Sequence, residues 1–187
     1  MRQPRMIFPI SDDDSELISP AWVTIGLIAL NVMLFVYQIS NPAFTTGWSA
    51  VPAEITRGID LNGIVPLGNS LSEGSLVVHT AGPKPIYLTL LSSMFMHGGW
   101  MHLGGNMLYL WIFGDNIEHR FGRMRFLLFF LISGVVGSLA HVFLAPHSVI
   151  PLVGASGAIS GILGAYIVLF PWNKVNAIIF YRLVTIP

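Results

Sequence analysis

The sequence predicts an all-α, polytopic bundle of transmembrane helices. Of its 187 residues, 53% are hydrophobic and only 10% are charged, whereas soluble domains usually carry about 25% charged residues. Four apolar stretches are long enough to cross a bilayer, which takes roughly 20 helical residues. None of the four contains a lysine, arginine, aspartate or glutamate. The chain has no cysteine, which excludes disulfides, thiolate metal sites and cysteine nucleophiles.

The four expected spans follow one another along the chain. The first covers residues 21–39, and a signal peptide is a poor interpretation of it because no small-residue cleavage site follows and three more spans do. The second lies within residues 86–113 and is interrupted by the run HGGWMHLGG. The third covers residues 126–144 and the fourth about residues 152–170.

Polar and turn-forming residues gather between the first two spans, at about residues 40–85. A loop of this size without clear periodicity is usually functional or disordered. We expect a partly helical lobe at the membrane surface, with Trp48 as an interfacial anchor. The chain then divides into an N-terminal segment, residues 1–19, and a membrane domain, residues 20–187, that includes this long outer loop.

The basic residues predict the orientation in the membrane. Seven of the nine flank the spans on one side, and the other two lie in the long loop. The positive-inside rule places the N-terminus in the cytoplasm and the long loop outside. Nine acidic residues balance the nine basic ones without a basic patch, so nucleic acid is not an expected partner. The seven are Arg2, Arg5, Arg120, Arg123, Arg125, Lys174 and Arg182, and the two are Arg57 and Lys84.

The localisation expected from these features is a bacterial inner membrane. The N-terminal segment is short and carries Asp12, Asp13 and Asp14. A mitochondrial targeting segment is basic and poor in acidic residues.

A serine flanked by small residues begins the fourth span, in the run Gly154-Ala155-Ser156-Gly157. A hydroxyl at a helix start is accessible, and the free backbone N–H groups there can stabilise a developing oxyanion. Helix packing is the competing interpretation, because small residues four apart let transmembrane helices approach closely. That pattern comprises Ser156, Ser160 and Gly164, and also Gly157 and Gly161.

Polar residues also interrupt the second span, as His97, His102 and Asn106. Since His102 and Asn106 are four apart, they share one helix face, whereas His97 is expected in the loop or first turn. Polar side chains at membrane depth usually mark functional sites. Interhelical hydrogen bonding is the structural alternative. A zinc site is disfavoured because there is no H-E-x-x-H pattern and no nearby carboxylate.

Three runs taken together resemble the rhomboid family of intramembrane serine proteases. They are residues 94–107 (MFMHGGWMHLGGNM), 118–122 (EHRFG) and 154–166 (GASGAISGILGAY). They occur in the family's order and at plausible spacing, and residues 51–54 (VPAE) are also similar to many bacterial members. The resemblance implies a rhomboid-like bundle, with about four spans present of an expected six.

The resemblance also implies roles for individual residues. Ser156 is expected to be the nucleophile, and the tetrahedral oxyanion is expected to be bound by His102, Asn106 and the backbone N–H of Ser156. Gly154 would permit the close approach of substrate and helix. The remaining motif residues are expected to be structural, with Glu118 anchoring the loop that follows it. These structural residues are His97, Glu118, Gly122, Gly157 and Gly161.

Rhomboid proteases use a serine–histidine dyad whose histidine lies in the sixth transmembrane helix. This chain ends at Pro187, before a fifth helix is complete, and none of its six histidines matches that position. His141 and His147 lie on the same side as Ser156, but we interpret them as a packing residue and a solvated loop residue. The chain alone is therefore expected to be inactive.

The function expected from the resemblance is intramembrane serine endopeptidase, acting on membrane proteins with a single transmembrane segment. No metal and no organic cofactor is implied. The expected partners are these substrates and the lipid bilayer. The leading alternative is an inactive relative that binds client transmembrane segments. A small transporter or channel is a third class, but it predicts matching halves, and the sequence shows no internal repeat.

Overall fold

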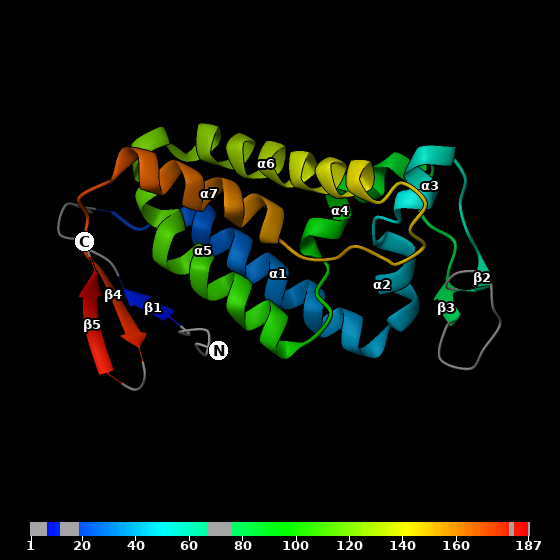
Figure 1. Cartoon of the computed structure of the whole chain (residues 1–187), viewed down its shortest axis with the longest axis horizontal. Helices are drawn as coiled ribbons and strands as arrows, with labels where there is room; N and C mark the ends of the chain where they lie inside the picture. Colours follow the sequence, from blue (N-terminus) through cyan, green and yellow to red (C-terminus); the bar gives the residue numbers. More distant parts are fainter. Residues whose placement is uncertain (1–6, 12–18, 67–75, 180–181, 187) are drawn as a thin grey trace, which may run out of the picture.

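The structure is a computed structural model that describes residues 7–11, 19–66, 76–179 and 182–186. Four long helices form a bundle, as the sequence predicted (Figure 1). They are α1 (Trp22–Ser40), α5 (Trp100–Phe121), α6 (Arg123–Leu144) and α7 (Ser156–Leu169). The site end of the bundle is defined here as the end at which α7 begins, and the Glu118 end is the opposite one. Successive helices run in alternating directions between these two ends.

The second span differs most from its expected position. Three short helical pieces precede it, η1 (Ile86–Leu88), α4 (Thr89–Ser92) and η2 (Ser93–Phe95). The backbone is then extended at Met96 and Gly99, so α5 begins only at Trp100 and runs on to Phe121. By length and composition, α1 and α6 could each cross a membrane within the described residues. The polar residues of α5 lower its hydropathy, and α7 is shorter, at 14 residues.

The core lies where the four helices meet. It is made of large apolar side chains that are nearly or fully buried, and each long helix contributes to it. In a bundle that spans a membrane, such side chains stabilise the fold mainly by van der Waals packing, because lipid tails are as apolar as the core. Its members include Leu27 and Phe35 of α1, Leu103, Leu110 and Ile117 of α5, Phe126 and Phe130 of α6, and Ile159, Ile162 and Tyr166 of α7.

Glycines bring α7 against α6. A Cβ placed on Gly157 would lie 3.2 Å from the Cα of Gly137, and one on Gly137 would lie 2.8 Å from the Cα of Gly157. A Cβ on Gly161 would collide with the side chain of Ser133. The structural role expected for Gly157 and Gly161 is therefore the close approach of these two helices.

The carboxylate of Glu118 binds the start of the first helix. It accepts hydrogen bonds from the backbone N–H of Val23 at 3.0 Å and of Thr24 at 2.7 Å. These N–H groups have no partner within α1, and a negative charge is favourable at a helix N-terminus. We had expected Glu118 to anchor the following loop, but its partners lie more than 90 residues earlier in the chain. Gly122, at a φ of 78°, ends α5 and allows α6 to begin at once.

Changing Glu118 to glutamine should lower the thermal stability of the protein more than its turnover. The neutral amide keeps an acceptor but loses the charge, and hydrogen bonds to a charged group contribute about 1.5–3 kcal/mol. We expect a clear drop in the thermal unfolding midpoint, because about 1 kcal/mol shifts it by 2–4 °C in a protein of this size. A turnover defect at unchanged unfolding temperature would contradict this role.

The segment between α1 and α5 is a partly helical lobe, as expected. It contains α2 (Pro42–Trp48) and α3 (Pro52–Arg57), and also a hairpin of β2 (Gly63–Pro66) and β3 (Leu76–His79) that was not predicted. The lobe is tied to the loop that leads into α7. Ala50 and Leu152 exchange two backbone hydrogen bonds, of 2.8 and 3.2 Å. The lobe therefore helps to hold the start of α7 in place.

A buried carboxyl in this lobe predicts a pH-dependent stability. Glu54 of α3 is 4% exposed, and burial raises its pKa from 4.5 to about 7, with Asp60 adding to the shift and a hydrogen bond from the Leu61 N–H opposing it. The folded state thus binds the proton more tightly than the unfolded state. Its stability should fall as the pH rises from about 4.5 through about 7.

We expect Glu54→Gln to unfold at nearly the wild-type temperature at pH 5 and a few degrees above it at pH 8, because about 1 kcal/mol corresponds to 2–4 °C. Thermal unfolding at both pH values measures this difference. The exposed Arg57 of the same helix provides the control, since Arg57→Gln should show no such dependence on pH. A gap between Glu54→Gln and wild type that is equal at both pH values would contradict the prediction.

A three-stranded antiparallel sheet lies at the Glu118 end (Figure 1). Its order is β1 (Ile7–Ser11), β4 (Val175–Ile179) and β5 (Arg182–Ile186), so it joins the beginning of the chain to the segment after α7. We had expected that last segment to begin a fifth helix. Strand pairing at long range overrides that expectation, helped by β-branched residues suited to strands. Arg2, Arg5, Asp12, Asp13, Asp14 and Pro187 lie outside the described residues.

Candidate active site

The loop before α7 places Ser156 at the first position of that helix. Gly154 has a φ of 116°, in the region that favours glycine, and its N–H donates to the carbonyl oxygen of Ser93 at 2.9 Å. Ala155 is fully buried, and Ser156 is exposed. Ser156 is thus exposed at the N-terminus of α7, where the first N–H groups have no partner within the helix.

Gly154 lies directly against two side chains of α5. A Cβ on Gly154 would be 2.6 Å from both Cε1 and Nε2 of His102, and 3.4 Å from Nδ2 of Asn106. A Cβ contact of 2.6 Å to a ring is too short, so glycine is needed here for space as well as for φ. His102, Asn106 and Gly154 are thus brought together next to Ser156, although His102 and Gly154 are 52 positions apart in the chain.

Asn106 presents an unpaired donor at this point. The residue is 9% exposed, and its Nδ2 has no hydrogen-bond partner among the described residues. Buried polar groups nearly always have a partner, and an unpaired one calls for an explanation. An amide N–H group held ready for an acceptor on a bound molecule is such an explanation.

His102 presents a second donor. The N–H of Gly98 points to Nδ1 of His102 at 3.4 Å, so Nδ1 is the acceptor in this contact. In the neutral imidazole the proton then resides on Nε2, the atom that faces Gly154. His97 lies in the non-helical turn before α5, as expected, and its ring packs edge-on against that of His102 with 5.3 Å between centroids.

His141 and His147 also lie near this end, but neither is hydrogen-bonded to the serine among the described residues. His141 lies in the last turn of α6 and His147 in the loop after it, and both are exposed. The described residues thus place an exposed serine next to Asn106 and His102, and no histidine among them is hydrogen-bonded to Ser156. Nor do they include a group of three or more His, Cys, Asp or Glu side chains that could hold a metal ion.

Three residues near the site were not identified from the sequence. Ser93 binds Gly154 through its carbonyl oxygen, Gly98 binds His102 through its N–H, and Gln38 of α1 binds the backbone of His97. Backbone contacts of the first two leave no trace in the sequence. Gln38 could have been identified from the sequence, because a polar amide side chain inside an apolar span indicates a functional or structural role.

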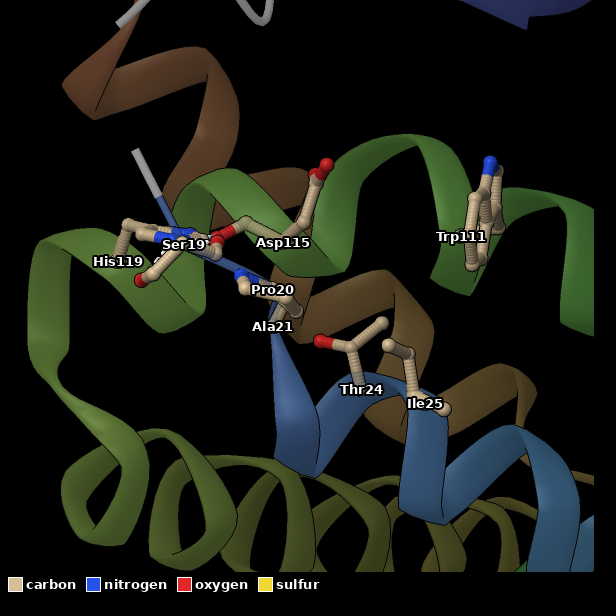
Figure 2. Close-up of a pocket in the computed structure, with 8 residues that line it drawn as sticks. All are labelled: Ser19, Pro20, Ala21, Thr24, Ile25, Trp111, Asp115 and His119. Atoms are coloured by element: carbon tan, nitrogen blue, oxygen red, sulfur yellow. Dashed lines mark hydrogen bonds between the residues drawn. The ribbon is translucent and has the colours of Figure 1, made fainter. Parts of the chain in front are cut away.

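A cavity of about 190 Å³ lies at the Glu118 end, between the start of α1 and the last turns of α5 (Figure 2). Its wall includes Thr24, Trp111, Asp115 and His119. His119 also bridges the two segments, with Nε2 2.7 Å from the carbonyl oxygen of Ser19. His119 and His102 are 17 residues apart on α5, which is about 25 Å along a helix. The cavity is therefore separate from the site around Ser156.

Comparison with known proteins identifies the family. The profile of the Rhomboid domain matches residues 85–186, which is more than half of the chain. The chain belongs to the rhomboid family. With that domain and its apolar helices, this rhomboid is an integral membrane protein.

Curated relatives include proteases and an inactive member. Rhomboid protease GluP of Bacillus subtilis (strain 168) is 34% identical over 135 residues, which cover 70% of this chain and 25% of the relative. Rhomboid protein 1, mitochondrial, of Saccharomyces cerevisiae is 36% identical over 97 residues, which cover 50% of this chain and 28% of the relative. Inactive rhomboid protein 1 of Drosophila melanogaster is 33% identical over 90 residues, which cover 48% of this chain and 6% of the relative.

This rhomboid spans only about a quarter of the length of the first two of these relatives. No solved structure gives a significant match to it. The family is thus shown by sequence, and the arrangement of the site by the structure described above.

Proposed function

We propose that this rhomboid is an intramembrane serine endopeptidase that cleaves membrane proteins with a single transmembrane segment. The observation that carries the proposal is the unpaired, buried Nδ2 of Asn106 beside Gly154. An acyl-transfer site requires a hydrogen-bond donor next to its nucleophile. Asn106 of α5 offers such a donor beside the start of α7, where Ser156 is exposed.

In the proposed reaction, Ser156 Oγ attacks the scissile carbonyl carbon and forms a tetrahedral intermediate. The oxyanion accepts hydrogen bonds from Nδ2 of Asn106, Nε2 of His102 and the backbone N–H of Ser156. Collapse of the intermediate releases the amine product and leaves an acyl-enzyme, which water hydrolyses. A serine needs a base to react. In the rhomboid proteases that the chain resembles, this base is a histidine. Such a histidine would take the proton of the Ser156 hydroxyl during attack and give it to the nitrogen of the leaving amine.

The proposed location is a bacterial inner membrane, with the N-terminus in the cytoplasm and Ser156 toward the outer side. The supporting observation is the distribution of charge. Arg120, Arg123 and Arg125 lie at the Glu118 end, and the lobe at the site end carries two basic residues, Arg57 and Lys84. Basic residues are enriched on the cytoplasmic side of membrane proteins.

The test is made with the full-length native protein in lipid vesicles. It is incubated with a fluorophosphonate, which reacts with activated serines, and separately with a single-span substrate carrying tags at both ends. We expect one labelled site, Ser156 by peptide mass, and two substrate fragments. No label and no fragments would overturn the proposal.

The second candidate is a client-binding protein without protease activity. It is favoured by the relative named Inactive rhomboid protein 1 and by the lack of a base for Ser156 among the described residues. The same experiment separates the two, because this candidate predicts that the tagged substrate is retained uncleaved by the protein and that Ser156 stays unlabelled.

A further inference from the structure

Gln38 binds both backbone polar groups of one residue near the site. It lies in the last turns of α1 and is 5% exposed. Its Oε1 accepts from the N–H of His97 at 3.1 Å, and its Nε2 donates to the carbonyl oxygen of His97 at 3.2 Å. Nε2 also donates to Oγ1 of Thr45, at 3.0 Å. Both N–H groups and one oxygen lone pair of this buried side chain on α1 are thus directed at the turn before α5 and at α2.

The turn before α5 depends on such outside partners. It is extended at Met96 and Gly99, so the N–H and carbonyl of His97 lack the partners that a helix would supply. A buried backbone group without a partner costs about as much as a lost hydrogen bond. Gln38 supplies both partners from a neighbouring helix and so determines where this turn lies.

The turn at residues 97–98 contacts the His102 ring at two points. Gly98, the next residue after His97, donates its N–H to Nδ1 of His102. The His97 ring also packs against the His102 ring. With Nδ1 occupied as an acceptor, the proton of neutral His102 stays on Nε2, toward Gly154. A displaced turn would free the ring to rotate and would allow the other tautomer.

We propose that Gln38 is a positioning residue for the oxyanion site, which holds the turn at residues 97–98 so that His102 keeps Nε2–H toward Gly154. Gln38 touches no reacting atom and acts only through His97 and Gly98. The proposal rests on the proposed function for its effect on turnover, but its effect on the tautomer of His102 can be observed without turnover.

The main test compares Gln38→Met, which has similar length but no hydrogen bonds, with Asn31→Leu. Asn31 is a matched control because it is a fully buried amide of the same helix whose Nδ2 binds its own helix, at the Leu27 carbonyl. The first readout is the ¹⁵N spectrum of histidine-labelled full-length protein, with the His102 signals assigned by their loss in His102→Gln. The second is kcat and KM for the tagged substrate.

We expect wild type and Asn31→Leu to show one His102 tautomer, with the proton on Nε2. Gln38→Met should show both tautomers and a kcat lowered by about 10-fold with little change in KM, because small displacements of catalytic groups can cost 10- to 100-fold. A lower unfolding temperature in Gln38→Met with wild-type tautomer and kcat would overturn the proposal, since that is the result of a merely structural role.

Gln38→Glu provides a rescue that also covers the case in which Gln38→Met fails to fold. A protonated carboxyl can accept from the His97 N–H and donate to the His97 carbonyl, whereas an ionised one can only accept. Its kcat relative to wild type at the same pH should therefore rise as the pH is lowered from 8 to 5. A ratio that stays as low as that of Gln38→Met at every pH would overturn the proposal, whereas a ratio near that of wild type at every pH is the result for a carboxyl that burial keeps protonated. If wild type itself gives no fragments, the proposed function fails, and the tautomer spectra still decide the role of Gln38.

Discussion

Alanine in place of Ser156 is expected to abolish cleavage of the single-span substrate. In the proposed mechanism the hydroxyl forms the covalent acyl-enzyme, and no neighbouring group can replace it. The variant should fold, because Ser156 is exposed and alanine is a better helix former. The measurement is fragment yield in lipid vesicles together with fluorophosphonate labelling, both of which should fall below detection.

Ser160 provides the matched control for this variant. It is an exposed serine one turn further along α7, and its hydroxyl donates to the carbonyl oxygen of Ser156 at 2.7 Å. Ser160→Ala removes a hydroxyl of the same kind from the same helix, and we expect turnover within a few-fold of wild type. Retained cleavage in Ser156→Ala would refute the assignment of the nucleophile.

Asn106→Ala is expected to lower kcat by on the order of 10²-fold, the usual cost of removing one oxyanion donor. KM should change little, because the donor is used in the transition state rather than in substrate binding. The folded state should lose little, since Nδ2 of Asn106 has no partner to lose among the described residues. Steady-state kinetics and thermal unfolding of the same preparations measure both effects.

Asn31→Ala is the control for this second variant. It removes a buried amide whose hydrogen-bond partner among the described residues is the carbonyl of Leu27 in the same helix. It should therefore affect unfolding temperature without the 10²-fold loss in kcat. An unchanged kcat in Asn106→Ala would show that Asn106 serves helix packing, which is the alternative that the sequence left open.

The spans and the shared helix face of His102 and Asn106 could be predicted from local patterns. Hydropathy located α1 and α6 to within a few residues, because apolar length is a local property of the chain. The four-residue spacing placed His102 and Asn106 on one helix face, as the structure has them. The packing interpretation of the serine motif describes a contact that the structure contains, since Gly157 and Gly161 pack on α6. The nucleophile interpretation stays a prediction, and Ser156 is exposed.

Other features could not be predicted because they depend on contacts between distant parts of the chain. Glu118 accepts hydrogen bonds from two backbone N–H groups at the start of α1. The local sequence around Glu118 does not indicate these partners. The pairing of β1 with β4 joins the two ends of the described chain. No periodicity within a segment reports such a partner.

The sequence by itself determined the fold class, the order of the spans and the residue types available for chemistry, because hydrophobic length and helical spacing are local. Only the tertiary structure decided that Gly154 meets His102 and Asn106, that Glu118 binds the N-terminus of α1, and that Gln38 holds the turn at His97. Each of these is a contact between segments brought together by packing. A buried polar group is satisfied by whichever partner the folded bundle places within reach.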